Sequence, residues 1–272
     1  MALANFAAYK AMVTTPAQRV YRGNSVLGTQ PVYLASFWTS SFPGPGVAPS
    51  TAEVPTEATA GALGQTDPSG QLWIPGVDIE IGNAASIAQL GNRTAIILCD
   101  RLSHQGGLDP ATSGTVTTNL PTAALTRYTS GVGVMAAVEV YATVTPAAQT
   151  YTLTYTDQDG NAAQTSQPVA VSQSNRFHFW PANLAAGDYG VRSVEEFTLS
   201  GAAAASGNWG ITLFKPLMIL PISPSGMYSM DAVLSLGGNI PEVLANACLF
   251  FLILTDSSNL GTFQSVVSLG EA

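Results

Sequence analysis

Histidine is the side chain most often used in proton transfer and metal binding, and this sequence has two. His104 lies in the glycine-containing segment Ser-His-Gln-Gly-Gly, where an imidazole could reach a partner. His178 lies between Phe177 and Phe179 in a predicted strand, so we expect its side chain on the face opposite both, toward solvent or an interface. Neither histidine belongs to a zinc-binding spacing. The sequence therefore predicts no metal site at these positions.

The carboxylates also lack the arrangement that catalysis needs. Glu195 and Glu196 are neighbours in a predicted strand, so they point to opposite faces and cannot flank one scissile bond. Asp157 and Asp159 resemble the start of a calcium loop, but Ala162 and Pro168 occupy the positions that require glycine and glutamate. We interpret the two aspartates as part of a hairpin turn, with weak calcium binding as the open alternative.

Motifs for covalent or cofactor chemistry are absent from the sequence. It contains no Gly-x-Ser-x-Gly nucleophile elbow and no phosphate-binding loop of the Walker type. We therefore expect a protein that is not an enzyme and that holds no cofactor.

Cysteine and tryptophan are predicted to fill the interior. Cys99 and Cys248 both lie among apolar residues, where free cysteines behave as small hydrophobes, and a disulfide between them is the less favoured alternative. The four tryptophans are predicted to pack in the core or an interface rather than to form a sugar-binding platform. They are Trp38, Trp73, Trp180 and Trp209.

Charge is scarce along the chain. Charged residues make up 10% of 272 residues, against about 25% in an ordinary soluble domain. The net charge is −8, and the lysines are Lys10 and Lys215, which excludes extensive neutralisation of nucleic-acid phosphates. The longest apolar run, 247–254, is too short for a membrane-spanning helix and is predicted to be a buried strand. The N-terminal sequence shows no basic leader with a long apolar segment, so we expect synthesis and folding in a cytoplasm.

A surface with so few ions loses little hydration energy when another chain covers it. We therefore favour a subunit of a large symmetric assembly. A low-charge secreted enzyme, or a bacterial protein that is merely rich in alanine and threonine, remains the alternative.

The pattern of strands and turns predicts a mainly β protein, an antiparallel β-sandwich or jelly roll with little helix. An N-terminal region, 1–130, is predicted to contain an extended Pro/Gly/Thr-rich arm at 41–70 and an irregular contact stretch at 101–128. A β-sandwich domain follows at 131–272. Weak helical spacing occurs at 3–13 and 230–236. The remaining strands are predicted at 31–38, 78–81, 93–98, 132–144, 151–155, 167–171, 176–180, 191–199, 209–220 and 263–269.

The arm and the irregular stretch are the predicted contact regions with other chains. Their neutral, punctuated sequences are poorly explained if they only face water. Within the second region the candidate interface residues are Arg101, His104, Arg127 and Tyr128. The two arginines are candidate hydrogen-bond donors to a neighbouring subunit.

Four blocks of sequence, 102–107, 114–131, 187–196 and 209–217, resemble virion structural proteins of tailed bacteriophages. Within that group the chain looks like a capsid decoration (cement) or minor capsid protein. The resemblance implies a homotrimer on the outer capsid surface, bound to the major capsid protein and made in the bacterial host cytoplasm. An outward position also suits the negative charge, which packaged DNA would repel. A tail or baseplate subunit, and a β-sandwich adhesin or carbohydrate-binding protein, remain the alternatives.

Overall fold

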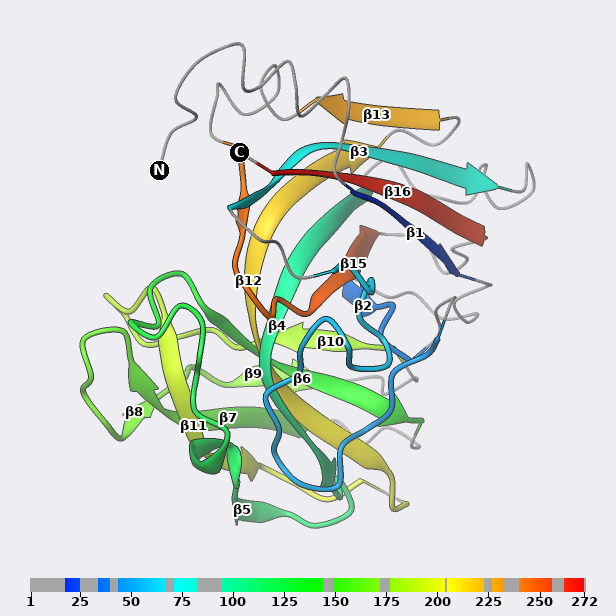
Figure 1. Ribbon diagram of the computed structural model, residues 1–272. Coiled ribbons are helices and arrows are strands. Elements are labelled where there is room, and N and C mark those ends of the chain that lie inside the picture. The colour runs from blue at the N-terminus through cyan, green and yellow to red at the C-terminus, as the bar shows by residue number, and fades with distance from the viewer. Residues whose placement is uncertain are drawn as a thin grey trace.

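Antiparallel strands form almost all of the regular structure (Figure 1). The computed structural model describes residues 18–24, 34–39, 44–66, 71–82, 94–143, 149–171, 177–203, 205–222, 227–231, 240–255 and 262–271. Within these ranges there are sixteen strands and one short 3-10 helix, η1 (Leu120–Thr122). The predicted fold class, mainly antiparallel β with little helix, is confirmed. No helix in these ranges has the length and apolar character needed to cross a membrane.

The strands form three sheets. The first sheet has the order β1 (Gln18–Asn24), β16 (Thr262–Glu271), β3 (Leu72–Gly82) and β13 (Met227–Asp231), with β14 (Glu242–Val243) also on β3. The central sheet has the order β10 (Phe179–Pro181), β6 (Met135–Ala142), β12 (Asn208–Ile222), β4 (Thr94–Leu108), β15 (Leu249–Thr255) and β2 (Leu34–Ser36). The third sheet has the order β5 (Gly114–Thr117), β11 (Val191–Leu199), β7 (Gln149–Asp157) and β8 (Gln164–Thr165), with β9 (Val169–Val171) also on β7.

Two long strands connect the other sheets. β4 and β12 have 15 residues each and pair along their length, and Figure 1 shows them running from beside the first sheet to beside the third. Ile96 and Leu98 of β4 belong to the core against the first sheet, whereas Leu102 belongs to the core against the third. Cys99 points to the opposite face of β4, into a third buried cluster with Trp38. The two cysteines are buried and form no disulfide with each other, as predicted.

The strand predictions at 191–199 and 209–220 are confirmed, and the strand predicted at 93–98 is longer than expected. The irregular stretch predicted at 101–128 is wrong over Arg101–Leu108, which continues β4, and over Gly114–Thr117, which forms β5. Its polar residues signalled a loop, but the interior of the protein gives several of them partners. The helix predicted at 230–236 is wrong at 230–231, which belong to β13. The remainder of that helix and the helix predicted at 3–13 lie outside the described residues.

The part of the arm that the structure describes, 44–66, contains no regular strand, as predicted. It packs on its own chain along the central sheet. The Gly106 amide donates to the carbonyl of Pro49 at 3.0 Å, and the Leu63 amide donates to the carbonyl of Leu249 at 2.9 Å. The boundary at residue 130 stays a prediction, and the pairing of β4 with β12 crosses it.

Gly210 allows the close approach of β12 to β4. A Cβ at this position would lie 2.2 Å from the carbonyl oxygen of Gln105 and 2.5 Å from the Tyr141 ring. We expect Gly210→Ala to lower the free energy of unfolding by about 1–3 kcal/mol, because the core is overpacked there. Urea denaturation measures the change. Gly44→Ala is the control, since a Cβ at Gly44 meets no atom within 4 Å, and equal stability of both variants would contradict the prediction.

Candidate functional site

The centre of the protein contains a buried ion pair. Arg101 on β4 donates from its guanidinium nitrogen Nη2 to both carboxylate oxygens of Glu139 on β6, at 2.7 and 3.0 Å. Both side chains are almost completely buried. The Glu139 carboxylate also accepts from the Thr212 hydroxyl at 2.8 Å and from the Tyr141 hydroxyl at 3.1 Å. Burial opposes ionisation of Glu139, but the charge of Arg101 and the hydrogen bonds from Ser36, Thr212 and Arg101 outweigh it and hold its pKa below the usual value.

A β-bulge in β4 places the side chains of Arg101 and His104 on the same face of the sheet. In a regular strand, residues three apart point to opposite faces. Arg101 pairs with Phe214, whereas Ser103 pairs with the adjacent Leu213, so β4 has an extra residue at this point. His104 therefore faces the same side as Arg101, and its Nδ1 lies 3.0 Å from Nη1 of Arg101.

These contacts fix the tautomer of His104. A guanidinium can only donate, so Nδ1 accepts and carries no proton. The proton is on Nε2, which donates to Oε1 of Glu53 in the arm at 2.8 Å. Burial lowers the pKa of His104, while the hydrogen bond from His104 lowers the pKa of Glu53. His104 is therefore a neutral link between a buried cation and a carboxylate whose side chain is 48% exposed.

Aromatic rings enclose the guanidinium of Arg101. Its central carbon lies 4.0 Å from the ring centroid of Trp38 and 4.7 Å from that of Phe250. Both distances fit cation–π contacts in a desolvated site. Trp38 also meets His104 edge to face, with ring centroids 5.4 Å apart. The same rings that exclude water thus hold the cation in place.

A second buried pair connects neighbouring segments. Arg127 donates to the two carboxylate oxygens of Asp100 at 2.9 and 3.0 Å. The same guanidinium donates to the carbonyl of Pro55 at 3.1 Å, and Asp100 accepts from the amide of Cys248 at 2.8 Å. Burial raises the pKa of Asp100, although Arg127 acts in the opposite direction. Together the two ion pairs join the arm to three strands of the central sheet.

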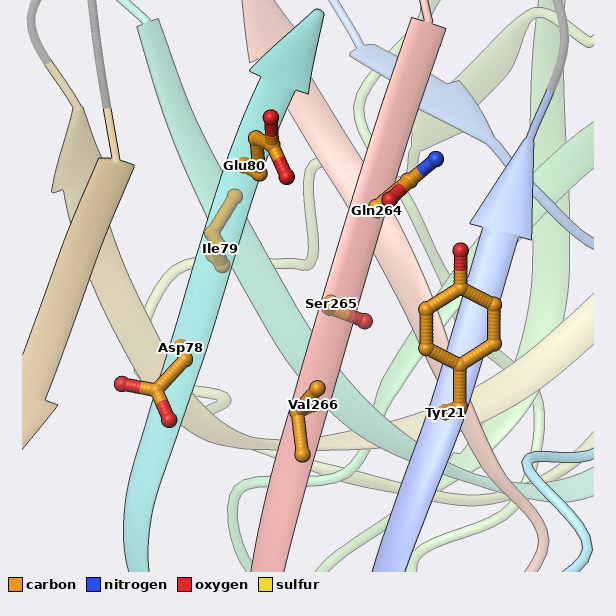
Figure 2. A pocket seen from close by; sticks show the side chains of 7 residues that line it. All are labelled: Tyr21, Asp78, Ile79, Glu80, Gln264, Ser265 and Val266. Atoms are coloured by element: carbon orange, nitrogen blue, oxygen red, sulfur yellow. The ribbon is translucent and has the colours of Figure 1, made fainter.

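This arrangement joins segments of the same chain to one another. The acceptors of Glu139 and Asp100 are used by internal donors. A shallow depression occurs elsewhere, on the outer side of the first sheet (Figure 2). It is lined by Tyr21, Asp78, Ile79, Glu80, Gln264, Ser265 and Val266, which include no histidine or cysteine.

Three of the four predicted interface residues, Arg101, His104 and Arg127, are buried within this chain. Tyr128 is half-buried at a positive φ of 49°, with Nζ of Lys215 5.6 Å from its ring, and burial raises its pKa. Contacts of these residues with another chain remain predictions.

Three partners of Arg101 and His104 in the network were not predicted from the sequence: Glu53, Glu139 and Thr212. One signal was available, since Glu139 is a lone charge in an apolar strand and such a charge needs a buried counterion.

The other residues that the sequence analysis considered for chemistry, the two aspartates and His178, contact their own chain. The hairpin turn is confirmed: the Asp157 carboxylate accepts from the amides of Asp159 and Asn161 at 2.8 and 2.9 Å. His178 is buried and lies edge to face with Trp180, so the prediction that it faces solvent is wrong, while a position at an interface stays a prediction. The adjacent Phe177, at a positive φ of 83°, interrupts the alternation that we assumed. No group of three metal-ligating side chains occurs among the described residues.

The Arg101–Glu139 pair leads to a test of stability. We expect Arg101→Met to lower the free energy of unfolding by about 3–5 kcal/mol, because it leaves a buried carboxylate without a counterion. The double variant Arg101→Met, Glu139→Leu should lose less, since both charges are removed. Urea denaturation compares the two, with Arg19→Met on the exposed side of β1 as the matched control. A double variant less stable than the single one would contradict the buried pair.

The His104–Glu53 link predicts a pH dependence. Native His104 stays neutral, whereas the unfolded chain takes up a proton near the ordinary value of 6.5. Stability is therefore present above this pH and falls as the pH decreases below it, by at most about 1.4 kcal/mol per pH unit for one proton. Urea midpoints at several pH values measure the slope. His104→Gln should flatten it, and an unchanged slope in that variant would exclude His104 as its source.

No family model matches the chain, and no curated protein matches it. Solved structures that align with it include a subviral particle of VP2 from infectious bursal disease virus, at 8% identity over 97% of this chain and 86% of that chain, with a TM-score of 0.23. T=1 particles derived from the same virus align at 10% identity over 97% and 83%, with a TM-score of 0.22. The stem and receptor-binding domain of spike protein P1 from bacteriophage PM2 aligns at 10% identity over 93% and 97%, with a TM-score of 0.13. TM-scores this low do not establish a shared fold.

Proposed function

We propose that this chain is a non-enzymatic structural protein of a tailed-phage particle, which decorates and stabilises the outer capsid by binding major capsid subunits. In this proposal it is made in the bacterial host cytoplasm and acts as a homotrimer. The resemblance of its sequence blocks to virion structural proteins supports the role, and the antiparallel fold is compatible with it. Its action is binding, so the proposal depends on a surface that another protein can cover.

The observation that carries the proposal is an exposed apolar strip on the central sheet. It consists of Ala95, Ile97, Ile219, Pro221 and Leu254, which lie in register on β12, β4 and β15. Ile219 is 56% exposed and Leu254 is 45% exposed, Pro221 is also exposed, and Ala95 and Ile97 are half-buried. These side chains point away from the core that neighbouring Met218 and Leu220 form with the first sheet. Contiguous exposed apolar surface marks a binding site, and covering it gains about 25 cal/mol per Å².

The charges support the same conclusion. No charged residue occurs in the segments 94–99, 216–222 or 249–255 that carry the strip. In addition, the two buried pairs remove Arg101, Arg127, Asp100 and Glu139 from a surface that already has few charges. A partner can therefore cover this region without stripping water from ions.

The contact regions predicted from sequence belong to the proposal as well. One side of the arm packs on its own sheet, while Val47 on the arm is 69% exposed. The stretch 109–128 contains exposed residues on and around β5. Both could supply further contacts to a neighbouring subunit.

Carbohydrate binding is a second candidate function. The tryptophans lie buried or half-buried, as predicted, so they form no exposed platform. The depression in Figure 2 instead combines the exposed ring of Tyr21 with the polar side chains of Asp78, Glu80 and Gln264. An aromatic face beside planar polar groups could hold a sugar ring. Binding to a glycan array, lost in Tyr21→Ala, would favour this function.

Quantification on purified particles tests the main proposal. We expect the chain in a copy number of the same order as the major capsid protein, whereas a tail or baseplate subunit would be far scarcer. The double variant Ile219→Lys, Leu254→Lys should bind weakly to capsids that lack the protein, because it places charges in the apolar strip. Thr165→Lys, an exposed position on the third sheet, is the matched control. Unchanged binding of the double variant, or absence of the protein from particles, would overturn the proposal.

A further inference from the structure

β5 forms an open edge of the third sheet. Within the described residues it pairs with β11 alone, and its other side has no strand beside it. Gly114, Thr115 and Thr117 are exposed and Val116 is half-buried. Figure 1 places β5 at the periphery of the molecule, below the rest of the sheet in that view.

The hydrogen bonds show which backbone groups point outward. The Thr118 amide donates to the carbonyl of Glu195 on the β11 side at 2.8 Å. Backbone groups alternate in direction along an antiparallel strand, so Val116 also directs its amide and carbonyl toward β11. Thr115 and Thr117 therefore direct theirs away from the sheet, where no other described strand accepts them.

Native proteins usually protect such an edge by keeping the strand very short, as β5 is with 4 residues, or with proline, lysine, a bulge or a covering loop. β5 has the sequence Gly-Thr-Val-Thr and none of these residues. Moreover, the sequence contains no charged residue between Asp109 and Arg127. The edge therefore has the β-branched composition and the neutrality that suit pairing with another strand.

We propose that β5 pairs with β5 of a second copy of this chain, antiparallel and around a two-fold axis at Val116. In this register Thr115 lies opposite the partner's Thr117, and both direct their backbone groups across the interface. Both copies thus satisfy the same donors and acceptors. Paired threonines add favourable side-chain contacts.

Electrostatics favours the same partner. Two chains with a net charge of −8 repel one another over most of their surfaces, so contact is easiest where charge is absent. The segment around β5 is such a place. This two-fold pairing is an association in addition to the proposed homotrimer, and it forms in solution without a capsid.

The register makes a sharp cross-linking prediction. Val116 and its symmetry mate would form a non-hydrogen-bonded pair, with Cα atoms about 4.5 Å apart, a separation that a disulfide can bridge. We expect purified Val116→Cys to form a covalent dimer under a mild oxidant, detected on a non-reducing gel. Thr165→Cys on β8 is the control and should remain monomeric on the gel. The native Cys99 and Cys248 are buried and give no background.

A proline variant tests the backbone pairing. The Thr117 amide points outward, so Thr117→Pro removes a donor from the edge without removing a bond to β11. We expect it to retain the melting temperature of the parent chain but to abolish the cross-link when combined with Val116→Cys. Sedimentation of the parent chain should show a self-association that Thr117→Pro weakens at least tenfold. A Val116→Cys chain that cross-links no more than Thr165→Cys, or equal sedimentation of both chains, would overturn the pairing.

The two proposals fail separately. Loss of capsid binding in the apolar-strip variant with an intact Val116→Cys cross-link would support both. Capsid binding by a chain that does not cross-link would leave the structural role standing and refute the β5 pairing.

Discussion

The structure depends on one buried cation. Arg101 sits between two aromatic rings and is neutralised by Glu139, and its contact with His104 extends the network to the arm. A guanidinium can only be held in such a place when its charge and most of its donors are matched. The pair therefore fixes the relative positions of β4, β6 and β12 and gives the arm a specific docking point. Apolar packing alone would position these segments less uniquely.

Much of the fold could be predicted from local sequence. Strands such as 191–199 are recognised by their β-branched residues and by the alternation of apolar and polar side chains. The prediction failed where tertiary contacts overrode local polarity. The polar sequence of Arg101–Leu108 is typical of a loop. These residues nevertheless continue β4 along β12, because Glu139 and Thr212 on the neighbouring strands accept hydrogen bonds from Arg101. The bulge that brings His104 beside Arg101 depends on the register with β12. The register between two strands so far apart along the chain cannot be recognised in a single sequence.

The exterior and the interior divide the few charges of the chain in a consistent way. Two of the nine basic residues, Arg101 and Arg127, form buried ion pairs within the chain. What remains outside is a surface with few charges and a net negative charge, in which an apolar strip and an open strand edge face water. Such features are costly for a solitary molecule because they invite association. They suit a subunit whose apolar strip and strand edge are buried against neighbouring chains in the assembly.

The long pairing of β4 with β12 and β15 also determines when the molecule can be completed during synthesis. Asp100 contacts the amide of Cys248, a separation of 148 residues along the chain. Loop closure over such distances slows folding, since the ordering cost comes before the contacts form. β4 therefore leaves the ribosome long before its partners exist. Until they emerge, the future centre of the protein is an unpaired apolar strand that the nascent chain must keep from aggregating.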